Sequence, residues 1–189
     1  MQDGERLVAL ARATPWFMQA LAQVRALRLR AWCVGAGAVR NLVWDALHGR
    51  EEPSVLADVD VAWFDAGDPA PARDAALQAQ LRLAAPQVPW EVTNQAGVHL
   101  WFERHFGHAV APLQSLEEAV ASWPEFATAV GVWLDDDDGL HVIAPHGLDD
   151  LFAMVVRRNP VRVSVETYGQ RVASKRYAER WPRVTVIDA

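Results

Sequence analysis

Cysteine is nearly absent from this 189-residue chain, which contains only Cys33. A single cysteine cannot form an intrachain disulfide, and its place between Trp32 and Val34 is typical of a buried strand residue. The chain also lacks an apolar run long enough to span a bilayer, and we identify no signal peptide. We therefore expect a cytoplasmic protein with no membrane partner.

Positive charge is scarce as well. The chain has 18 Lys and Arg against 24 Asp and Glu, for a net charge of −6. Proteins bind long nucleic acids mainly through clustered Lys and Arg, so this balance argues against a nucleic-acid partner. A single phosphorylated ligand is still compatible with it, because basic residues gather near the C-terminus: Arg171, Lys175, Arg176, Arg180 and Arg183.

Apolar residues are plentiful, at 51% of the chain, and include nine tryptophans. The tryptophans are spread along the whole chain, which favours a role in core packing over a local stacking platform. The length suits one domain. We predict a single domain over residues 1–189, in which residues 160–189 form a C-terminal helical appendage.

The hydrophobic periodicity predicts alternating helices and strands. Strands are expected at 31–34, 57–64 and 90–93, and a hairpin at 127–134 and 140–143 turns through an Asp-rich loop. Helices are expected at 15–27, 38–48, 72–84, 148–157 and 165–180, the first with Thr14 as its N-cap. This order predicts an α/β (α+β) fold, a mixed β-sheet flanked by helices.

Two carboxylates occupy the second predicted strand. Asp58 and Asp60 are two residues apart, so they point to the same face, while Val59 and Val61 point to the other. Adjacent like charges raise each other's pKa and call for a compensating cation. A hard divalent metal with oxygen ligands is the best match for such a pair. A solvated strand end is the alternative reading.

A glycine-rich turn lies about twenty residues upstream. It contains Gly35 and Gly37 and leads directly into a predicted helix. Glycines let backbone N–H groups approach phosphate oxygens, and the start of a helix adds a favourable dipole. A turn of this kind before an Asp-x-Asp strand predicts a phosphate site next to a metal site.

These residues resemble a known superfamily. The run Gly37-Ala38-Val39-Arg40-Asn41 followed by Asp58-Val59-Asp60-Val61 is similar to the Gly-Gly-x-Val-Arg-Asp and Asp-x-Asp motifs of tRNA nucleotidyltransferases, which have the polymerase-β-type nucleotidyltransferase fold. Over nearly its full length the chain resembles a bacterial family of nucleotidyltransferase-like proteins. That closer resemblance includes the segments at 40–45, 90–96, 123–125 and 145–152.

The resemblance implies a Mg²⁺-dependent transfer of a nucleotidyl group from an NTP to a small acceptor. Asp58 and Asp60 would hold the metal, and Glu91 on the third strand would be the third ligand and general base. The phosphates would lie against Gly35, Gly37, Arg40 and Asn41. A catalytically inactive nucleotide-binding or regulatory module with this fold is the main alternative, and a metal-dependent phosphoester hydrolase is a third.

The sequence departs from the family motif at three positions. Ala36 stands where the motif has its first glycine, Asn41 replaces an aspartate, and Glu91 stands where most members have Asp. Ala36 could hinder the approach of backbone to phosphate. Ala36 and Glu91 favour the inactive module, and Asn41 argues against a tRNA substrate.

Several polar residues have both a functional and a structural reading. Arg40 could contact phosphate or pair with Asp58 or Asp65, and Asn94 could bind a base or cap a loop. Glu125 could line a cleft, although a buried or capping role is favoured. The spacing of His99, His105 and His108 fits no zinc motif known to us. The four aspartates at 135–138 lack the ligand pattern of a calcium loop and are assigned to the hairpin turn.

Overall fold

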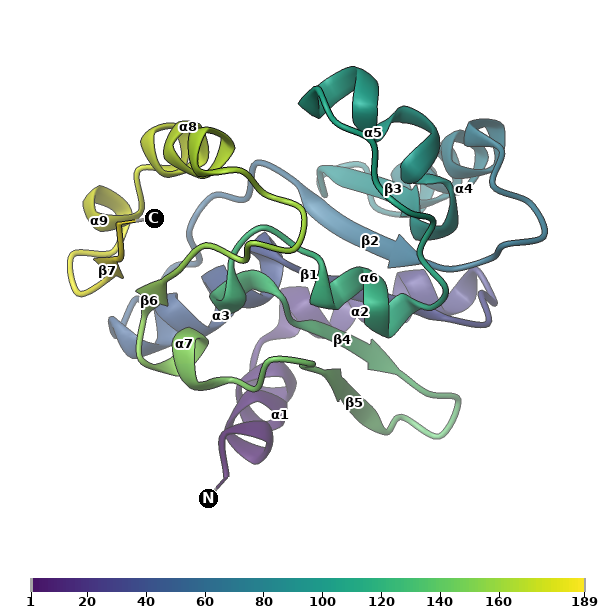
Figure 1. Cartoon of the computed structure of the whole chain (residues 1–189). Helices are drawn as coiled ribbons and strands as arrows, with labels where there is room; N and C mark the ends of the chain where they lie inside the picture. Colours follow the sequence, from purple (N-terminus) through teal and green to yellow (C-terminus); the bar gives the residue numbers. More distant parts are fainter. Residues whose placement is uncertain (1, 189) are drawn as a thin grey trace.

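Five short strands form the central sheet of the computed structural model, which describes residues 2–188 (Figure 1). In chain order they are β1 (Trp32–Gly35), β2 (Val59–Trp63), β3 (Trp90–Asn94), β4 (Gly131–Leu134) and β5 (Leu140–Ile143). The spatial order is β3-β2-β1-β4-β5. Only β2 and β3 run parallel, and the other pairs are antiparallel. The predicted mixed sheet flanked by helices is confirmed.

The parallel pair is the part of the sheet that matters most for the site. Its connection passes through α4 (Pro71–Ala84), which packs against β3. The register places Asp60 beside Glu91, and Val59 beside Trp90. Residues paired in this way point to the same face of the sheet. The acidic residues of β2 and β3 therefore share one face.

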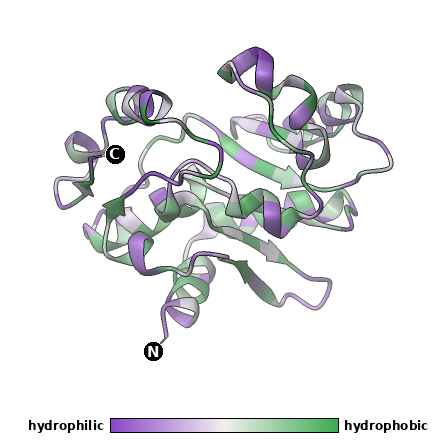
Figure 2. Cartoon of the chain, in the orientation of Figure 1, coloured by the Kyte–Doolittle hydropathy of each residue, from purple (hydrophilic) through white to green (hydrophobic). Residues whose placement is uncertain are grey.

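The main hydrophobic core lies on the opposite face of the sheet. It is covered by α1 (Asp3–Ala13), α2 (Pro15–Ala26), α3 (Gly37–Leu47) and α4. Figure 2 shows the hydrophobic residues of the sheet and of these helices in green. Four tryptophans are almost fully buried, as expected for core packing: Trp44, Trp63, Trp90 and Trp181.

A smaller cluster covers part of the acidic face. Cys33 and Ala62 pack there against Leu116 and Val120 of α6 (Leu116–Ala121). Cys33 is buried, as the sequence predicted. This face is covered by α6 at β1 and opens towards β3, where Glu91 is exposed and Asp60 is only partly exposed.

The rest of the chain forms short elements around the open face. They are the 3₁₀ turns η1 (Gln95–Gly97) and η2 (Phe126–Thr128), α5 (His99–Phe106), α7 (Asp149–Phe152), β6 (Val155–Val156), α8 (Val165–Lys175), α9 (Tyr177–Arg180) and β7 (Thr185–Val186). In Figure 1, α8 and α5 stand on either side of β2. The division into one domain with a C-terminal appendage stays a prediction.

Two predicted helices differ from those observed, and one observed helix was not predicted. The helix expected at 148–157 stops at Phe152, because Val155 and Val156 pair with β7 as a strand. The helix expected at 165–180 breaks at Arg176, whose left-handed backbone (φ 51°) separates α8 from α9. The N-terminal helix α1 was not predicted at all.

Thr14 is the N-cap residue of α2, as predicted, but its hydroxyl donates a hydrogen bond back to the Leu10 carbonyl oxygen (2.8 Å) and accepts none from the helix. One further expectation needs correction. The strand expected to start at 127 starts at Gly131, because residues 126–128 form η2. Across residues 2–188, no helix combines the length and apolar character needed to cross a membrane.

Candidate active site

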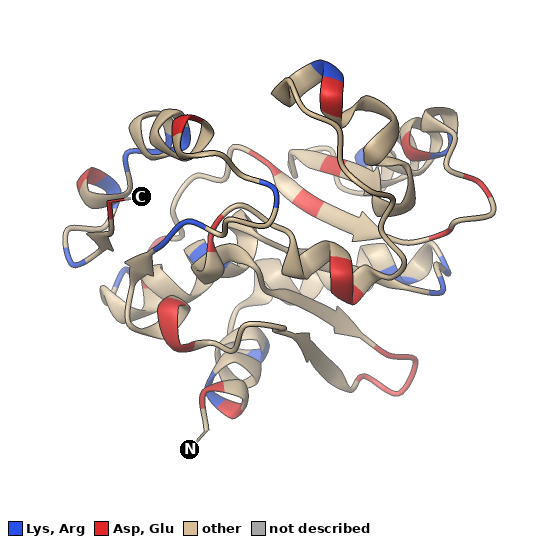
Figure 3. Ribbon diagram, in the orientation of Figure 1, with Lys and Arg blue, Asp and Glu red and all other residues tan. Residues whose placement is uncertain are grey.

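Three carboxylates lie side by side on the open face of the sheet. Asp58 comes just before β2, Asp60 is on β2, and Glu91 is the registered partner of Asp60 on β3. Val59 and Val61 point into the core and are almost fully buried, so the alternation along β2 is as predicted. Acidic residues mark both strands in Figure 3. The fold thus brings together the three acids predicted as metal ligands.

Their side chains do not close around one point. Within residues 2–188, no three His, Cys, Asp or Glu side chains converge closely enough to hold a metal ion. Glu91 is exposed, and the side chain of Asp58 keeps 33% of its accessible surface. The three acids lie on one face of the sheet and repel one another, but their side chains do not form a complete set of metal ligands.

Among the three acids, Asp60 has a strongly raised pKa. Burial, followed by repulsion from Asp58 and Glu91, raises its pKa to about 7, although Lys175 and Arg171 partly oppose the effect. The contributions of Asp58 and Glu91 to this rise reflect three acids that lie within electrostatic reach of one another. Carboxylate oxygens of this kind suit a hard divalent cation such as Mg²⁺.

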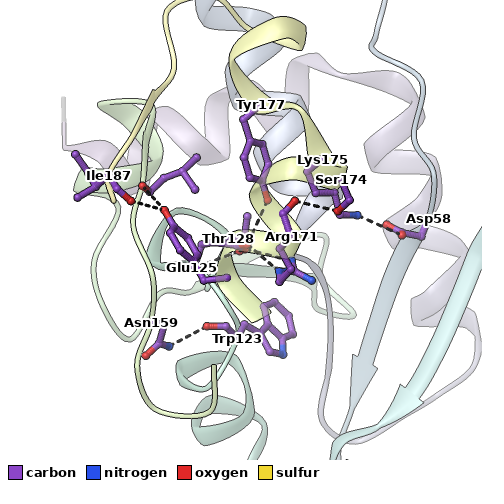
Figure 4. Close-up of polar contacts among 12 residues, drawn as sticks. Asp58, Trp123, Glu125, Thr128, Asn159, Arg171, Ser174, Lys175, Tyr177 and Ile187 are labelled. Carbon is purple, nitrogen blue, oxygen red and sulfur yellow. Dashed lines mark hydrogen bonds and ion pairs between the residues drawn. The ribbon is translucent and has the colours of Figure 1, made fainter. Parts of the chain in front are cut away.

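The chain's only lysine faces this cluster. Lys175, in the last turn of α8, places its Nζ 4.0 Å from Asp58 Oδ2 (Figure 4). Both side chains are about one-third exposed, so the pair contributes roughly 0–1 kcal/mol to stability. Its main effect is to bring a positive charge from the C-terminal segment to the edge of the acidic face.

Gly35 has a packing role that the sequence did not predict. A Cβ on this residue would lie 2.6 Å from the Trp123 ring and 2.8 Å from the Val130 carbonyl oxygen. Both contacts are too close for any side chain, so packing explains the glycine. Its assignment to phosphate binding gains no support from this position, and Gly37 is the turn glycine that faces the carboxylates.

The turn itself consists of Ala36 and Gly37. Ala36 has φ 49° and ψ −117°, a conformation that glycine adopts readily and alanine does not. The missing Cβ of Gly37 faces Asp58 Oδ1 at 3.6 Å and Arg40 Nη2 at 3.5 Å. No side chain caps α3, and in the described part of the chain the N–H groups of residues 37–39 have no acceptor. These N–H groups are available to an anion.

Replacing Ala36 by glycine is expected to stabilise the protein. The strained backbone of a non-glycine residue costs about 1–3 kcal/mol, and the added chain entropy of glycine offsets about 0.5–1 kcal/mol. We expect a net gain of about 1 kcal/mol in the free energy of unfolding, measured in urea. Ala173→Gly on the exposed face of α8 is the matched control and should lose about 1 kcal/mol. A loss of stability in Ala36→Gly would contradict the assigned strain.

Arg40 is held among aromatic rings beneath this turn. Only 4% of it is exposed, and its guanidinium lies 5.2–5.7 Å from the ring centres of Tyr177, Trp181 and Trp44. Its Nη2 donates to Asn41 Oδ1 (2.8 Å), and its buried Nε has no hydrogen-bond partner. Among the described residues it forms no ion pair, so the predicted alternative of a bridge to Asp58 or Asp65 is wrong.

A cavity of about 520 Å³ joins these features. Gly37, Arg40, Asn41 and Asp58 form one wall, and the other wall comes from the end of α8 and from α9. That second wall carries three basic side chains, Lys175, Arg176 and Arg180, and one acid, Glu179, which pairs with Arg176. A wall with this excess of positive charge, opposite free N–H groups, is suited to a polyphosphate. We call this space the phosphate cavity.

Comparison with known proteins places this geometry in a family. A family model described as nucleotidyltransferase matches residues 22–186. The chain belongs to the nucleotidyltransferase family. It is similar to an NMR structure reported to reveal a CCA-adding enzyme head domain, with 29% identity, a TM-score of 0.82, and coverage of 98% of this chain and 96% of the other.

Two larger enzymes share the fold of this chain. A CCA-adding enzyme with CTP has 12% identity and a TM-score of 0.55, and covers 99% of this chain but 43% of its own. An apo tRNA-processing enzyme has 20% identity and a TM-score of 0.51, with 89% and 42% covered. The chain therefore spans less than half of either enzyme. Curated proteins gave no match.

One buried ion pair links α8 to the segment just before η2. Glu125 is fully buried and accepts hydrogen bonds from Arg171 Nε (2.8 Å) and Thr128 Oγ1 (2.8 Å) (Figure 4). Tyr177 also donates to it (3.3 Å). Burial alone would raise the pKa of Glu125, but Arg171 and Thr128 outweigh burial and hold it below its ordinary value.

This pair positions α8, and sequence reasoning missed that role. Arg171 and Lys175 lie one turn apart on α8, so fixing Arg171 on Glu125 fixes the approach of Lys175 to Asp58. The sequence favoured a buried or capping role for Glu125, which is confirmed. Its partner was not foreseeable, because the two residues are 46 positions apart.

The remaining polar candidates have structural roles. Asn94 Oδ1 accepts from the Asp65 and Ala96 N–H groups, and its Nδ2 donates to the Asp65 and Asp68 carbonyls, so it caps the loop after β3. Asp65 accepts from Gly67 N–H and pairs with Arg73. The Asp-rich segment forms the β4–β5 turn, where the Asp135 carboxylate accepts from two backbone N–H groups.

Proposed function

We propose that this member of the nucleotidyltransferase family is a cytoplasmic enzyme that transfers a nucleotidyl group from an NTP to a small acceptor, with Mg²⁺ as cofactor. One observation carries the proposal. Asp58, Asp60 and Glu91 share an open face of the sheet, directly beside a helix start whose N–H groups have no acceptor. Metal-dependent transfer of a phosphate-linked group needs both features together.

The triphosphate would bind in the phosphate cavity. The N–H groups at the start of α3 would donate to its oxygens, and the helix dipole would favour their negative charge. Lys175 and Arg176 line the other wall and would neutralise the outer phosphates. The Arg40 guanidinium also lines the cavity, held in place by its three aromatic neighbours and by Asn41.

Glu91 would serve as the general base. It is exposed and lies beside Asp60, so it can reach a hydroxyl group that approaches the acidic face. The acceptor oxygen would form a bond to the α-phosphorus while the bond from that phosphorus to the bridging oxygen breaks. Pyrophosphate leaves, and the hydroxyl proton passes to Glu91. Mg²⁺ bound to Asp58 and Asp60 would neutralise charge on the phosphates.

The proposed acceptor is a small molecule rather than a nucleic acid. The net charge of −6 is unfavourable for a long polyanion, and the chain has a single lysine. The chain also spans only 42–43% of the tRNA-processing and CCA-adding enzymes described above. Their tRNA-related activity is therefore not assigned to it.

A nucleotide-binding module without turnover is the second candidate. It is favoured by one observation, that the three carboxylates do not converge within the described residues. Such a module would bind NTP in the phosphate cavity but would release no pyrophosphate. The two candidates therefore differ in a measurable product.

Pyrophosphate release tests the proposal. Wild-type protein with Mg²⁺, each of the four NTPs and a panel of hydroxyl-bearing acceptors should release pyrophosphate with at least one combination. Asp58→Asn should lower the rate at least about 100-fold, because it removes a proposed metal ligand. Asp137→Asn, in the exposed hairpin turn, is the matched control and should leave the rate unchanged. NTP binding without pyrophosphate release across the panel would support the inactive module instead.

A further inference from the structure

A second cavity lies on the other side of Glu91 from the phosphate cavity. It has a volume of about 230 Å³ and is enclosed by α5, the Trp123-Pro124 segment, and residues from 162 to 171. Most of its walls are apolar or aromatic: Val98, Trp101, Phe102, Phe106, Leu113 and Trp123. We call it the aromatic cavity. It can enclose one substituted ring and is too small for a whole nucleotide.

Its position suits the partner of the proposed transfer. Glu91 and Thr93 line the aromatic cavity, and both residues also line a groove along β3 that reaches Asp58. Asp58 in turn lines the phosphate cavity. The carboxylates therefore lie between the two spaces. A donor in one and an acceptor in the other would meet at the proposed general base.

One cation in this cavity has an unmet hydrogen bond. Arg162 donates from Nη2 to the Ala111 carbonyl oxygen (2.6 Å), and its guanidinium lies 5.7 Å from the Phe102 ring centre. Its Nη1 is buried and has no partner among the described residues. Burial lowers the pKa of Arg162, while Glu118 acts weakly in the opposite direction. Nη1 is closed off from the cavity in this conformation, so the Arg162 side chain would have to turn to expose it. An anionic oxygen would then satisfy both the hydrogen bond and the charge.

The other arginine in the cavity is already satisfied. Arg171 is committed to Glu125 through two hydrogen bonds. Arg162 is thus the group that selects the charge of a ligand, and the aromatic walls select its shape. Stacked and tilted ring contacts among Trp101, Phe102 and Phe106 line this side of the cavity.

We propose that the aromatic cavity binds the acceptor, a small aromatic carboxylate whose acid group pairs with Arg162 and whose hydroxyl group is directed to Glu91. The role of this ligand as acceptor rests on the proposed function, but binding of the acid does not require turnover. The chemistry of the step is that given above: the hydroxyl oxygen joins the α-phosphorus, pyrophosphate leaves, and Glu91 takes the proton. The end of an RNA strand, with a base in the cavity, is the competing ligand.

The test is an NMR titration of the full chain without nucleotide, with 4-hydroxybenzoate as the probe. We expect shifts of the Trp101 indole and Arg162 side-chain signals. The neutral analogue 4-hydroxybenzyl alcohol should bind about tenfold more weakly. In Arg162→Gln, the preference for the acid should disappear. Arg104→Gln, on the exposed side of α5, is the matched control and should bind like the wild type.

Several outcomes would overturn the inference. Equal affinity of wild type for the acid and the alcohol removes the role of Arg162, and this comparison stands even if Arg162→Gln fails to fold. Absence of any shift at Trp101 removes the site. A CpCpC trinucleotide that shifts these signals at lower concentration than the acid assigns the cavity to RNA. Acid binding without pyrophosphate release would leave this site standing while the proposed function fails.

Discussion

Asp60→Asn is expected to make the metal-free protein more stable at pH 8, by about 1–3 kcal/mol, and to raise its melting temperature by about 3–10 °C. The pKa of Asp60 is raised from an ordinary value of 3.8 to about 7, chiefly by burial and then by Asp58 and Glu91. A rise of this size corresponds to at most about 4 kcal/mol, and partial contact with water reduces it. Asparagine has the same shape and carries no charge.

The sign of the pH dependence follows from this shift. Between about pH 4 and pH 7 the folded state binds the Asp60 proton more tightly than the unfolded state does. The stability of the wild type should therefore fall as the pH rises through this window and level off above it. Asp60→Asn should remove that part of the slope, so the two proteins should be equally stable near pH 4.

Thermal unfolding in EDTA at several pH values measures this difference. Asp137→Asn is the matched control, since it removes a charge from the exposed hairpin and should leave the slope unchanged. Adding Mg²⁺ with an NTP should raise the melting temperature of the wild type and not that of Asp60→Asn. Equal pH slopes in wild type and Asp60→Asn would contradict the assigned strain.

Glu125→Gln should have the largest effect on folding. It leaves the Arg171 guanidinium partly buried without its counter-charge, and breaking buried pairs of this kind costs about 3–5 kcal/mol. The Arg171 side chain keeps 32% of its accessible surface, so we expect about 2–4 kcal/mol, measured by urea unfolding. Glu179→Gln, which breaks the exposed pair with Arg176, is the matched control and should change stability by less than about 1 kcal/mol.

A double variant separates the charge from the packing. Glu125→Gln with Arg171→Met removes both members of the pair, so part of the lost stability should return. NTP binding should stay weaker in the double variant, because α8 no longer has a fixed position from which Lys175 can reach the cavity. A loss below about 1 kcal/mol in Glu125→Gln alone would show that the pair does not hold α8.

The sequence predicted those parts of the site that depend on local pattern. The same-face placement of Asp58 and Asp60 follows from the two-residue repeat of a strand. Gly37 at the start of a helix follows from glycine chemistry and the helical pattern after it. That Glu91 lies beside Asp60 does not follow from local pattern alone. It depends on the pairing of β3 with β2, whose register sets the two residues opposite each other.

Other parts depend on contacts that local pattern does not reveal. Gly35 was predicted to bind phosphate, and its packing against Trp123 and the Val130 carbonyl could not be foreseen, because both residues are distant in the sequence. Arg40 has aromatic neighbours, among them Tyr177, in place of the ion pair that was the structural alternative to phosphate contact. The helix that the periodicity predicts at 165–180 is interrupted at Arg176, although the sequence pattern there is continuous. In each case distant residues decide a role that the local sequence leaves open.

The most direct test of the central claim is paramagnetic broadening by Mn²⁺ in the presence of a non-hydrolysable CTP or ATP analogue. Bound near the three carboxylates, Mn²⁺ should first erase the backbone NMR signals of Asp58, Asp60 and Glu91, together with those at the start of α3. The signals should persist in Asp58→Asn/Asp60→Asn at the same Mn²⁺ concentration. Broadening confined to the Asp135–Asp138 turn, or broadening unchanged in the double variant, would contradict a metal–nucleotide site on this face of the sheet.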